Sequence, residues 1–380
     1  MQLTRLMLEN WRNFRQVDVA LRRRMFLVGP NACGKSNLLD AIRFLRDIAD
    51  PQGGLARAVA HPMRRGVSQL RSLHARRQSN VVVGVEAMLD GDDQPWYYRI
   101  EFSQDSQRRP VVRGEEVKHG DLVLLHRPDA DDEADPGRLA QTHLEQVSLN
   151  KGFRPLAEAL AQIRYLHLVP QLVRQPDAVV ARAGDPWGSD LLEQMARTPS
   201  RTRDARLRRI TDALTVAVPQ LKQLRLHTDE RGVPHLEGQY EHWRPNAGWQ
   251  TEEQFSDGTL RLLGLLWAFL DGKAPLLLEE PELSLHNGVV VHIPQMLARV
   301  TRVTGRQVII STHSAELLND DGIDGGEVIL LTPEEEGTAA VLSHDDAEIR
   351  QLLEAGLTVG QVIIPRTSPA RSVQLSLFEL

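Results

Sequence analysis

The sequence predicts an α/β fold organised around a phosphate-binding loop. Residues 29–36 read Gly-Pro-Asn-Ala-Cys-Gly-Lys-Ser, which is the spacing of such a loop. An apolar run at 25–28 precedes the loop and a helical pattern at 37–45 follows it, and this is the context that phosphate binding requires. Two further strands are predicted much later in the chain, an apolar one at 276–278 and one at 307–313 that runs into His313. Strands that alternate with helices indicate a sheet flanked by helices.

The residues of the loop have separate predicted roles. Gly29 and Gly34 let the backbone curl, so that successive N–H groups face one concavity at the start of a helix. Lys35 would reach the β- and γ-phosphates of a nucleoside triphosphate, and the Ser36 hydroxyl would hold Mg²⁺. The alternative is a glycine turn with a purely structural role, and the flanking strand and helix argue against it. The loop therefore predicts a P-loop NTPase.

Size, charge and cysteine content narrow the class of protein. The 380 residues suffice for two domains or one elaborated domain. The sequence has no apolar run of about 18 residues and no charged, apolar leader, so we expect no membrane association and a cytoplasmic location. A net charge of −6 does not by itself indicate nucleic-acid binding. The single cysteine, Cys33, excludes internal disulfides and cysteine-based zinc sites.

The patterns along the chain predict five parts. Residues 1–80 would form the first half of a nucleotide-binding core, with the phosphate loop. Residues 81–127 would form an antiparallel β-lobe, and residues 138–225 a helical insertion. The core would resume at 226–345, and a helix and tail would follow at 346–380.

Local patterns justify the elements of the first half in turn. Apolar alternation or continuity predicts strands at 3–8, 17–21 and 25–28, followed by a helix at 36–49. Turn residues separate the four predicted strands of the β-lobe, which are 81–89, 96–102, 111–117 and 122–125. The acidic segment 128–137 is expected to be a loop or a disordered hinge.

Helical periodicity dominates the segment that follows. The predicted helices are 139–149, 155–163, 191–195 and 207–214. A strand at 163–169 is expected to return to the main sheet, and 224–226 with 235–240 to form a hairpin. An apolar helix is predicted at 262–270. The tail is expected to contain strands at 323–331 and 338–342, a helix at 346–354 and a Pro/Ser-rich end.

The strand at 276–278 ends in acids, as a Walker B segment does. We assign Glu279 to the metal ion and Glu280 to the attacking water, which it would orient or deprotonate. A glutamate at the first of these places, where aspartate is usual, has an arm one methylene longer. The alternative is that these acids cap the next helix, and the phosphate loop upstream favours the catalytic interpretation.

Two more segments supply candidate site residues. Ser256 and Gly258 would place a hydroxyl and a closely approaching backbone at the start of the apolar helix, where an anion can bind. The alternative for Ser256 is an ordinary N-cap. His313 follows the strand at 307–313 and could contact the γ-phosphate or the water.

The order of these motifs resembles an ABC-type ATPase head of the RecF, SMC and OLD group. The motifs are the phosphate loop with Asn37, Ser-Asp-Gly-Thr at 256–259, Glu-Glu-Pro-Glu at 279–282 and Ser-Thr-His-Ser at 311–314. The N-terminal segment 8–15, Leu-Glu-Asn-Trp-Arg-Asn-Phe-Arg, is also similar to that group. The sequence shows no sustained heptads, and residues 319–380 are too few for the nuclease domain of OLD proteins. We therefore expect a stand-alone head without coiled coil or nuclease.

The resemblance implies a mechanism in which two heads enclose two ATP molecules. Lys35, Ser36, Glu279, Glu280 and His313 would then act on the nucleotide held by their own head. Ser256 and Gly258 would contact the nucleotide that the partner head holds, and Arg261 is a further candidate for this contact. The resemblance also implies nucleotide contacts from Arg12, Asn31 and Asn37.

Some features depart from the family pattern or stay open. Asp257 stands where the family has glycine, and we expect its side chain to face away from phosphate. Gln69 and Gln171 are both candidates for the glutamine loop. Cys33, next to a helix N-terminus, is predicted to have a lowered pKa and a reactive thiol.

The resemblance implies an ATP-hydrolysing dimer that drives a DNA-related process, repair or phage defence, with a nuclease or effector partner. Six arginines, expected on one helix, could face a phosphate backbone, or could simply form a solvated face: Arg197, Arg201, Arg203, Arg206, Arg208 and Arg209. The alternative function is an assembly scaffold with slow ATP turnover and no direct DNA contact. A transporter motor fits less well, because no clear membrane-coupling glutamine loop is present.

Overall fold

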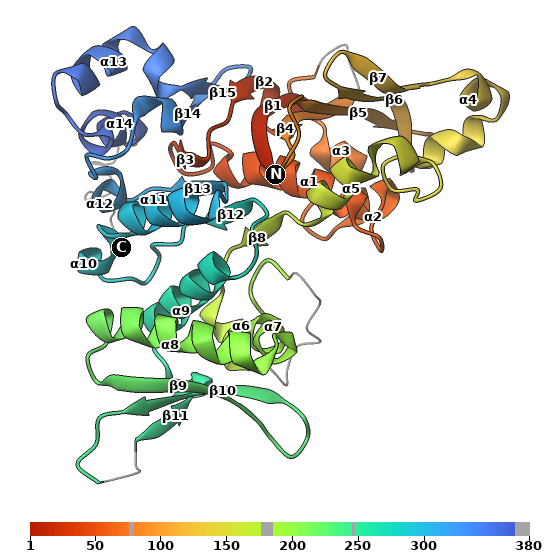
Figure 1. Ribbon diagram of the computed structural model, residues 1–380. Coiled ribbons are helices and arrows are strands. Elements are labelled where there is room, and N and C mark those ends of the chain that lie inside the picture. The colour runs from red at the N-terminus through yellow and green to blue at the C-terminus, as the bar shows by residue number, and fades with distance from the viewer. Residues whose placement is uncertain (76–79, 176–184, 245–247, 369–380) are drawn as a thin grey trace, which may run out of the picture. The chain divides into compact units, whose positions relative to one another are not determined.

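A computed structural model describes residues 1–75, 80–175, 185–244 and 248–368 (Figure 1). Contacts within the chain divide it into two units. Unit 1 comprises Met1–Arg164, Lys273–Leu277 and Leu297–Leu380, and unit 2 comprises Tyr165–Gly272 and Leu278–Met296. Among the helices so described, none has both the length and the apolar character needed to cross a membrane.

An antiparallel sheet of six strands forms one part of unit 1. Its order is β2 (Phe14–Ala20), β1 (Gln2–Trp11), β4 (Val81–Met88), β5 (Trp96–Gln104), β6 (Pro110–His119) and β7 (Leu122–Arg127). All four predicted strands of the β-lobe are confirmed. They continue the N-terminal hairpin instead of standing apart from it, because β4 pairs with β1 from Gln2–Met88 to Glu9–Val82.

The second sheet carries the phosphate loop. Its order is β15 (Gly337–Leu342), β14 (Val328–Glu334), β3 (Arg24–Val28), β13 (Val308–Thr312), β12 (Leu276–Glu279) and β8 (Arg164–Leu166). β3 runs parallel to β13 and β14, and every residue of β3 and β13 is buried. Strands covered on both faces read as continuous apolar runs, which is why these strands are predictable from the sequence. β8 and β12 each begin in unit 1 and end in unit 2.

Aromatic rings hold the first helix against the antiparallel sheet. Phe44 of α1 (Lys35–Ala49) lies with its ring centroid 5.2 Å from Trp11 of β1 and 5.3 Å from Phe102 of β5. All three rings are fully buried, so they fix the helix that follows the phosphate loop.

The other helices of unit 1 are short. They are α2 (Leu55–Ala60), α3 (Val67–Leu70), α4 (Ala130–Ala134), α5 (Arg154–Ala161), α12 (Ala315–Leu318), α13 (Ala347–Glu354) and α14 (Val359–Thr367), and α11 (Ile293–Thr304) begins in unit 2. The predicted helix at 346–354 is confirmed as α13. α14 occupies part of the predicted Pro/Ser-rich end, and a capping box at Thr358 starts this helix. Residues 369–380 of the predicted tail lie outside the described residues.

Two expectations for the middle of unit 1 are wrong. The acidic segment 128–137 contains α4, which a capping box of Asp129 and Asp132 begins. The segment 139–149 is not an α-helix: Pro136–Ala140 form a 3-10 helix, and turns and bends follow up to residue 149. Its backbone N–H groups at His143 and Leu144 instead donate to the Glu115 carboxylate, at 2.7 and 3.0 Å. A buried acid on β6 therefore takes the donors that a helix would use.

Unit 2 combines helices with a small sheet. Its helices are α6 (Pro170–Arg174), α7 (Leu191–Arg197), α8 (Ser200–Ala217), α9 (Asp257–Leu270) and α10 (Asn287–Val290). Its antiparallel sheet has the order β11 (Trp249–Thr251), β10 (Pro234–Tyr240) and β9 (Leu221–Thr228). The predicted hairpin is confirmed as β9 and β10, with β11 added. Residues 176–184 and 245–247 lie outside the described part of the chain.

Candidate active site

The phosphate loop joins β3 to α1 with a backbone that favours glycine. Gly34, the N-cap of α1, has φ 103°, and Ala32 has φ 63°. A Cβ on Gly34 would lie 2.2 Å from the Asn13 Nδ2 atom, so no larger residue fits there without movement. At this helix start, within the described residues, no side chain caps α1. A helix begun in this way can offer its first N–H groups to an anion.

Lys35 and His313 are brought together in unit 1. The Lys35 ammonium donates to the carbonyl oxygens of Gly29, at 2.9 Å, and Pro30, at 3.0 Å. It also lies 3.4 Å from Nδ1 of His313, the first residue after β13. Lys35 is buried and His313 is exposed. The lysine therefore folds back over its own loop, next to the histidine that the sequence singles out.

Asn13, which sequence reasoning missed as a site residue, braces the phosphate loop. Its Nδ2 donates to the Cys33 carbonyl and to Thr338 Oγ1, each at 2.7 Å. Its Oδ1 accepts from Asn37 Nδ2, also at 2.7 Å. Asn13 lies in the turn between β1 and β2, so this turn ties the loop to β15. The available signal was the asparagine between two aromatic residues in segment 8–15.

Of the three further residues expected at the nucleotide, the structure places two in contacts with protein. The Asn37 amide is held by Asn13. Arg12, at φ 52°, donates to Asp40 Oδ2 at 3.1 Å and to the Met63 carbonyl at 2.8 Å. Asn31 lies exposed in the loop. Nucleotide contacts from these three residues stay predictions.

The prediction of a reactive Cys33 is wrong. Its thiol is 1% exposed. Burial raises the pKa of Cys33, and this effect exceeds the opposing influence of the Lys35 charge and of the backbone N–H groups of Lys35 and Cys33. A neutral, covered thiol is a poor nucleophile.

In unit 2, β12 ends at Glu279, whose carboxylate accepts a hydrogen bond, and the next residue, Glu280, has a strained backbone. Glu280 has φ 43°, a conformation that costs a residue other than glycine roughly 1–3 kcal/mol and is typical of functional sites. The Tyr165 hydroxyl donates to Glu279 Oε2. His167 Nδ1 lies 3.9 Å from the same oxygen. Sequence reasoning found the strand that carries Tyr165 but not the role of its side chain.

The segment before α9 is an N-cap and a close backbone contact. Ser256 Oγ accepts from the Thr259 N–H at 3.1 Å, so the alternative of an ordinary N-cap describes this hydroxyl correctly. A Cβ on Gly258 would lie 2.7 Å from the Ser284 carbonyl oxygen, so glycine lets the segment after Glu280 pack against α9.

Asp257 and its neighbours connect α9 to α6. The Asp257 carboxylate pairs with Arg174 Nη2, and Gln171 Nε2 lies 3.4 Å from its second oxygen. The Arg174 guanidinium also donates to the Phe255 carbonyl at 2.7 Å. The other glutamine-loop candidate, Gln69, is exposed on α3, so the choice between the two stays open.

The comparisons with known proteins identify the family. The sequence matches the family described as "AAA domain, putative AbiEii toxin, Type IV TA system" over residues 24–319. The chain belongs to this family. No curated protein matches the sequence.

This AAA-domain protein also has the fold of solved Smc heads. An Smc head bound to the C-winged helix domain of ScpA is 15% identical, with TM-score 0.58, covering 91% of this chain and 100% of that one. An Smc head with an extended coiled coil, bound to the C-terminal domain of ScpA from Pyrococcus furiosus, is 13% identical, with TM-score 0.55, covering 93% and 99%. The predicted α/β fold of an ABC-type ATPase head is confirmed.

The residues of this ATPase head fit a magnesium nucleotide. The loop curls through positive φ at Ala32 and Gly34, and the Lys35 ammonium lies within it. The described residues contain no group of three His, Cys, Asp or Glu side chains that could hold a metal ion. Mg²⁺ at nucleotide sites is usually held by one or two protein ligands together with phosphate oxygens. Ser36 of unit 1 and Glu279 of unit 2 stay the predicted ligands.

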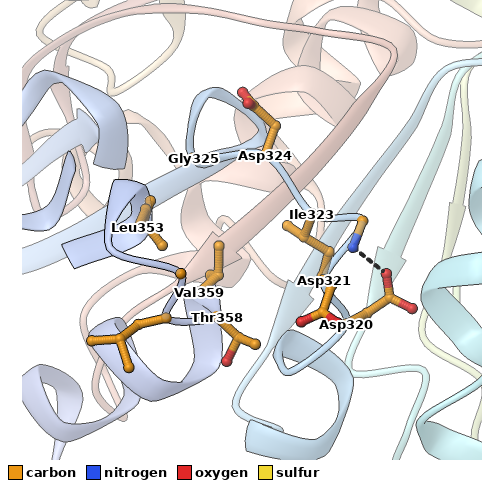
Figure 2. A pocket seen from close by; sticks show the side chains of 11 residues that line it. Asp320, Asp321, Ile323, Asp324, Gly325, Leu353, Thr358 and Val359 are labelled. Atoms are coloured by element: carbon orange, nitrogen blue, oxygen red, sulfur yellow. Dashed lines mark hydrogen bonds between the residues drawn. The ribbon is translucent and has the colours of Figure 1, made fainter. Parts of the chain in front are cut away.

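A separate cavity of about 430 Å³ lies in unit 1. The loop from Asp320 to Gly325 and the segment from Gly356 to Val359 line it, with Leu353 of α13. Figure 2 shows the side chains of Asp320 and Asp321 at this cavity. The Gly322 N–H donates to Asp320 Oδ1 at 2.9 Å. None of the residues predicted to hold the nucleotide lines this cavity.

Proposed function

We propose that the protein hydrolyses ATP to ADP and phosphate and dimerises around ATP. The observation that carries the proposal is the Lys35 ammonium, 3.4 Å from His313 Nδ1, on a loop whose helix has no side-chain cap among the described residues. The fold of an ABC-type head supports the same chemistry.

Each residue has a task in this reaction. Lys35 holds the β- and γ-phosphates, and His313 donates to the γ-phosphate. Ser36 and Glu279 would hold Mg²⁺, which would supply positive charge to offset the charge that develops on the phosphates. Glu280 orients the attacking water and accepts its proton.

The dimer supplies the second half of each site. In this proposal, the start of α9 of one copy, with Ser256 and Gly258, faces the γ-phosphate held by Lys35 of the other copy. The N–H groups and partial positive charge of a helix start favour an anion there.

The proposal includes a DNA-related role with a separate protein partner. Both Smc heads described above are bound to a domain of ScpA, and we infer a protein partner, a nuclease or other effector, for this head too. For DNA, only part of the arginine cluster is suitable. Arg197 lies on α7, separate from α8, because Thr198 and Pro199 interrupt the helix.

Three arginines of α8 are the best candidates for a phosphate backbone. Arg206 pairs with Asp271 at 2.9 Å, and Arg203 lies 3.3 Å from Asp204. Arg201, Arg208 and Arg209 are exposed. Exposed guanidinium groups contribute to DNA affinity through release of counterions.

ATP turnover tests the enzymatic proposal. Lys35→Ala should lose ATP binding. Glu280→Gln should keep binding and lose turnover by about 10²–10⁴-fold, because a general base contributes that much. Lys151→Ala, which changes an exposed lysine in unit 1, is the control. Equal turnover by Glu280→Gln and the natural protein would contradict the assignment. ATP-bound oligomers with negligible turnover in the natural protein would favour the scaffold alternative.

Salt dependence tests the DNA proposal separately. Replacing Arg201, Arg208 and Arg209 by glutamine should reduce the slope of log affinity against log salt by about 0.9 for each phosphate that these arginines neutralise. Arg197→Gln is the control, since Arg197 pairs with Glu193 at 2.7 Å. A slope that the triple substitution leaves unchanged would remove α8 from the DNA proposal.

A further inference from the structure

The Walker B acid Glu279 is held by a side chain from a neighbouring strand. Tyr165 is the middle residue of β8, the neighbour of β12 in the sheet, and it is 6% exposed. Its hydroxyl donates to Glu279 Oε2. The Glu279 side chain is 15% exposed, so the contact is largely shielded from water.

A second residue of the same segment confines this carboxylate. His167 Nδ1 lies 3.9 Å from Glu279 Oε2. The backbone N–H of His167 donates to the Pro186 carbonyl at 2.7 Å, and this bond fixes the backbone at His167. Tyr165 and His167 therefore approach the Glu279 carboxylate from one segment, whose backbone is held in place.

Glu279 has a physical need for such restraint. A glutamate has one more rotatable bond than an aspartate, so its carboxylate can occupy more positions around a cation. A hydrogen bond from a buried phenol restricts those positions, and groups that orient a metal ligand commonly set metal affinity.

We propose that Tyr165 is a positioning residue that holds Glu279 in the orientation in which it binds the Mg²⁺ of a magnesium nucleotide. This inference rests on the proposed function, because it concerns the same site. It assigns Tyr165 no contact with the nucleotide and no part in proton transfer.

Tyr165→Phe removes the hydroxyl and keeps the ring. A fluorescent ATP analogue titrated with Mg²⁺, and separately measured in EDTA, reports the metal requirement for binding independently of turnover. Tyr165→Phe should bind the analogue in EDTA as the natural protein does. It should need about 10–100-fold more Mg²⁺ for half-maximal metal-dependent binding. Tyr97→Phe, a half-buried tyrosine on β5, should match the natural protein.

The outcomes separate this inference from the proposed function. A natural protein that shows no Mg²⁺-dependent binding overturns the proposed function. A natural protein that binds normally, with Tyr165→Phe unchanged in its Mg²⁺ requirement, overturns only the role of Tyr165. If the role of Tyr165 were purely structural, Tyr165→Phe would lower the unfolding temperature without changing the Mg²⁺ concentration for half-maximal binding. That result would also contradict the inference.

Glu279→Asp approaches the same contact from the other side. The shorter acid withdraws from Tyr165 by one methylene and leaves the tyrosine intact. We expect Glu279→Asp, Tyr165→Phe and the double variant to share one raised Mg²⁺ midpoint, because each breaks the same contact. If Tyr165→Phe does not fold, an unchanged Mg²⁺ midpoint in Glu279→Asp still contradicts the inference.

Discussion

At the scale of single residues, the phosphate loop depends on Asn13. One amide group joins the loop at Cys33, the first turn of α1 at Asn37 and the strand β15 at Thr338. The loop is therefore shaped by a side chain from another segment as well as by its own glycines.

Removing this amide should weaken both stability and nucleotide binding. Asn13→Ala leaves the Cys33 carbonyl and the Asn37 amide without their partner, and each unsatisfied group costs about 1–3 kcal/mol. Thr338→Val is the matched control, because it removes a partner of Asn13 outside the loop. Asn13→Ala should lower both the free energy of unfolding in urea and the affinity for ATP. Thr338→Val should lower the affinity for ATP less. Equal ATP affinity in Asn13→Ala and the natural protein would contradict the role of Asn13 in holding the phosphate loop.

Cys33 gives a second prediction for a single residue. Burial raises the pKa of its thiol, so the thiolate fraction at neutral pH is below that of a free cysteine. Labelling by iodoacetamide should therefore be slow in the folded protein and fast in urea. Its rate in the folded state should rise with pH. Labelling of the folded protein as fast as that of a free thiol would contradict the burial of Cys33.

At the scale of elements, one buried network joins β6, β7 and α4. Arg127 pairs with Glu115 at 3.0 Å and with Asp132 at 2.8 Å, and all three side chains are 0% exposed. The hydrogen bond from Arg127 holds the pKa of Asp132 at about 2. This network holds α4 within the acidic segment, where the charge pattern indicated a loop or a disordered hinge.

Arg127→Met should destabilise the protein strongly. The change leaves two buried acids without their cation, and breaking a buried ion pair costs about 3–5 kcal/mol. Arg109→Met is the control, because Arg109 pairs with Asp105 at 2.7 Å while 70% exposed, and exposed pairs contribute about 0–1 kcal/mol. Urea unfolding compares the two variants. Equal destabilisation in both would show that the network contributes no more than a surface pair.

The elements found from the sequence are those with a local signal. β3 contains the apolar run 25–28 and β13 the apolar run 308–310, and the loop before α1 has a fixed spacing. The elements missed depend on distant partners. The segment 139–149 is not helical because Glu115 takes its donors, and no local pattern reveals that contact.

The same distinction applies to the candidate site. Lys35 and His313 are recognisable because each lies at the end of a predicted strand or in a spaced motif. Asn13 and Tyr165 act through contacts with residues far along the chain, Cys33 and Glu279. Such roles follow only from the arrangement of the strands.

At the scale of the whole molecule, the proposed function comes down to one central claim. Two copies of the chain would close on ATP, with the loop at Lys35 facing the start of the partner's α9. Hydrolysis would then reopen the pair, because the water that Glu280 is proposed to activate would cleave off the γ-phosphate that both copies are proposed to hold.

The mass of Glu280→Gln in solution, measured by light scattering after size exclusion, tests this claim most directly. The variant should have the monomer mass of 42.7 kDa without nucleotide and twice that mass with ATP and Mg²⁺. Adding Lys35→Ala to the same variant should restore the monomer mass in ATP. A Glu280→Gln protein that binds ATP and Mg²⁺ yet keeps the monomer mass would contradict the account.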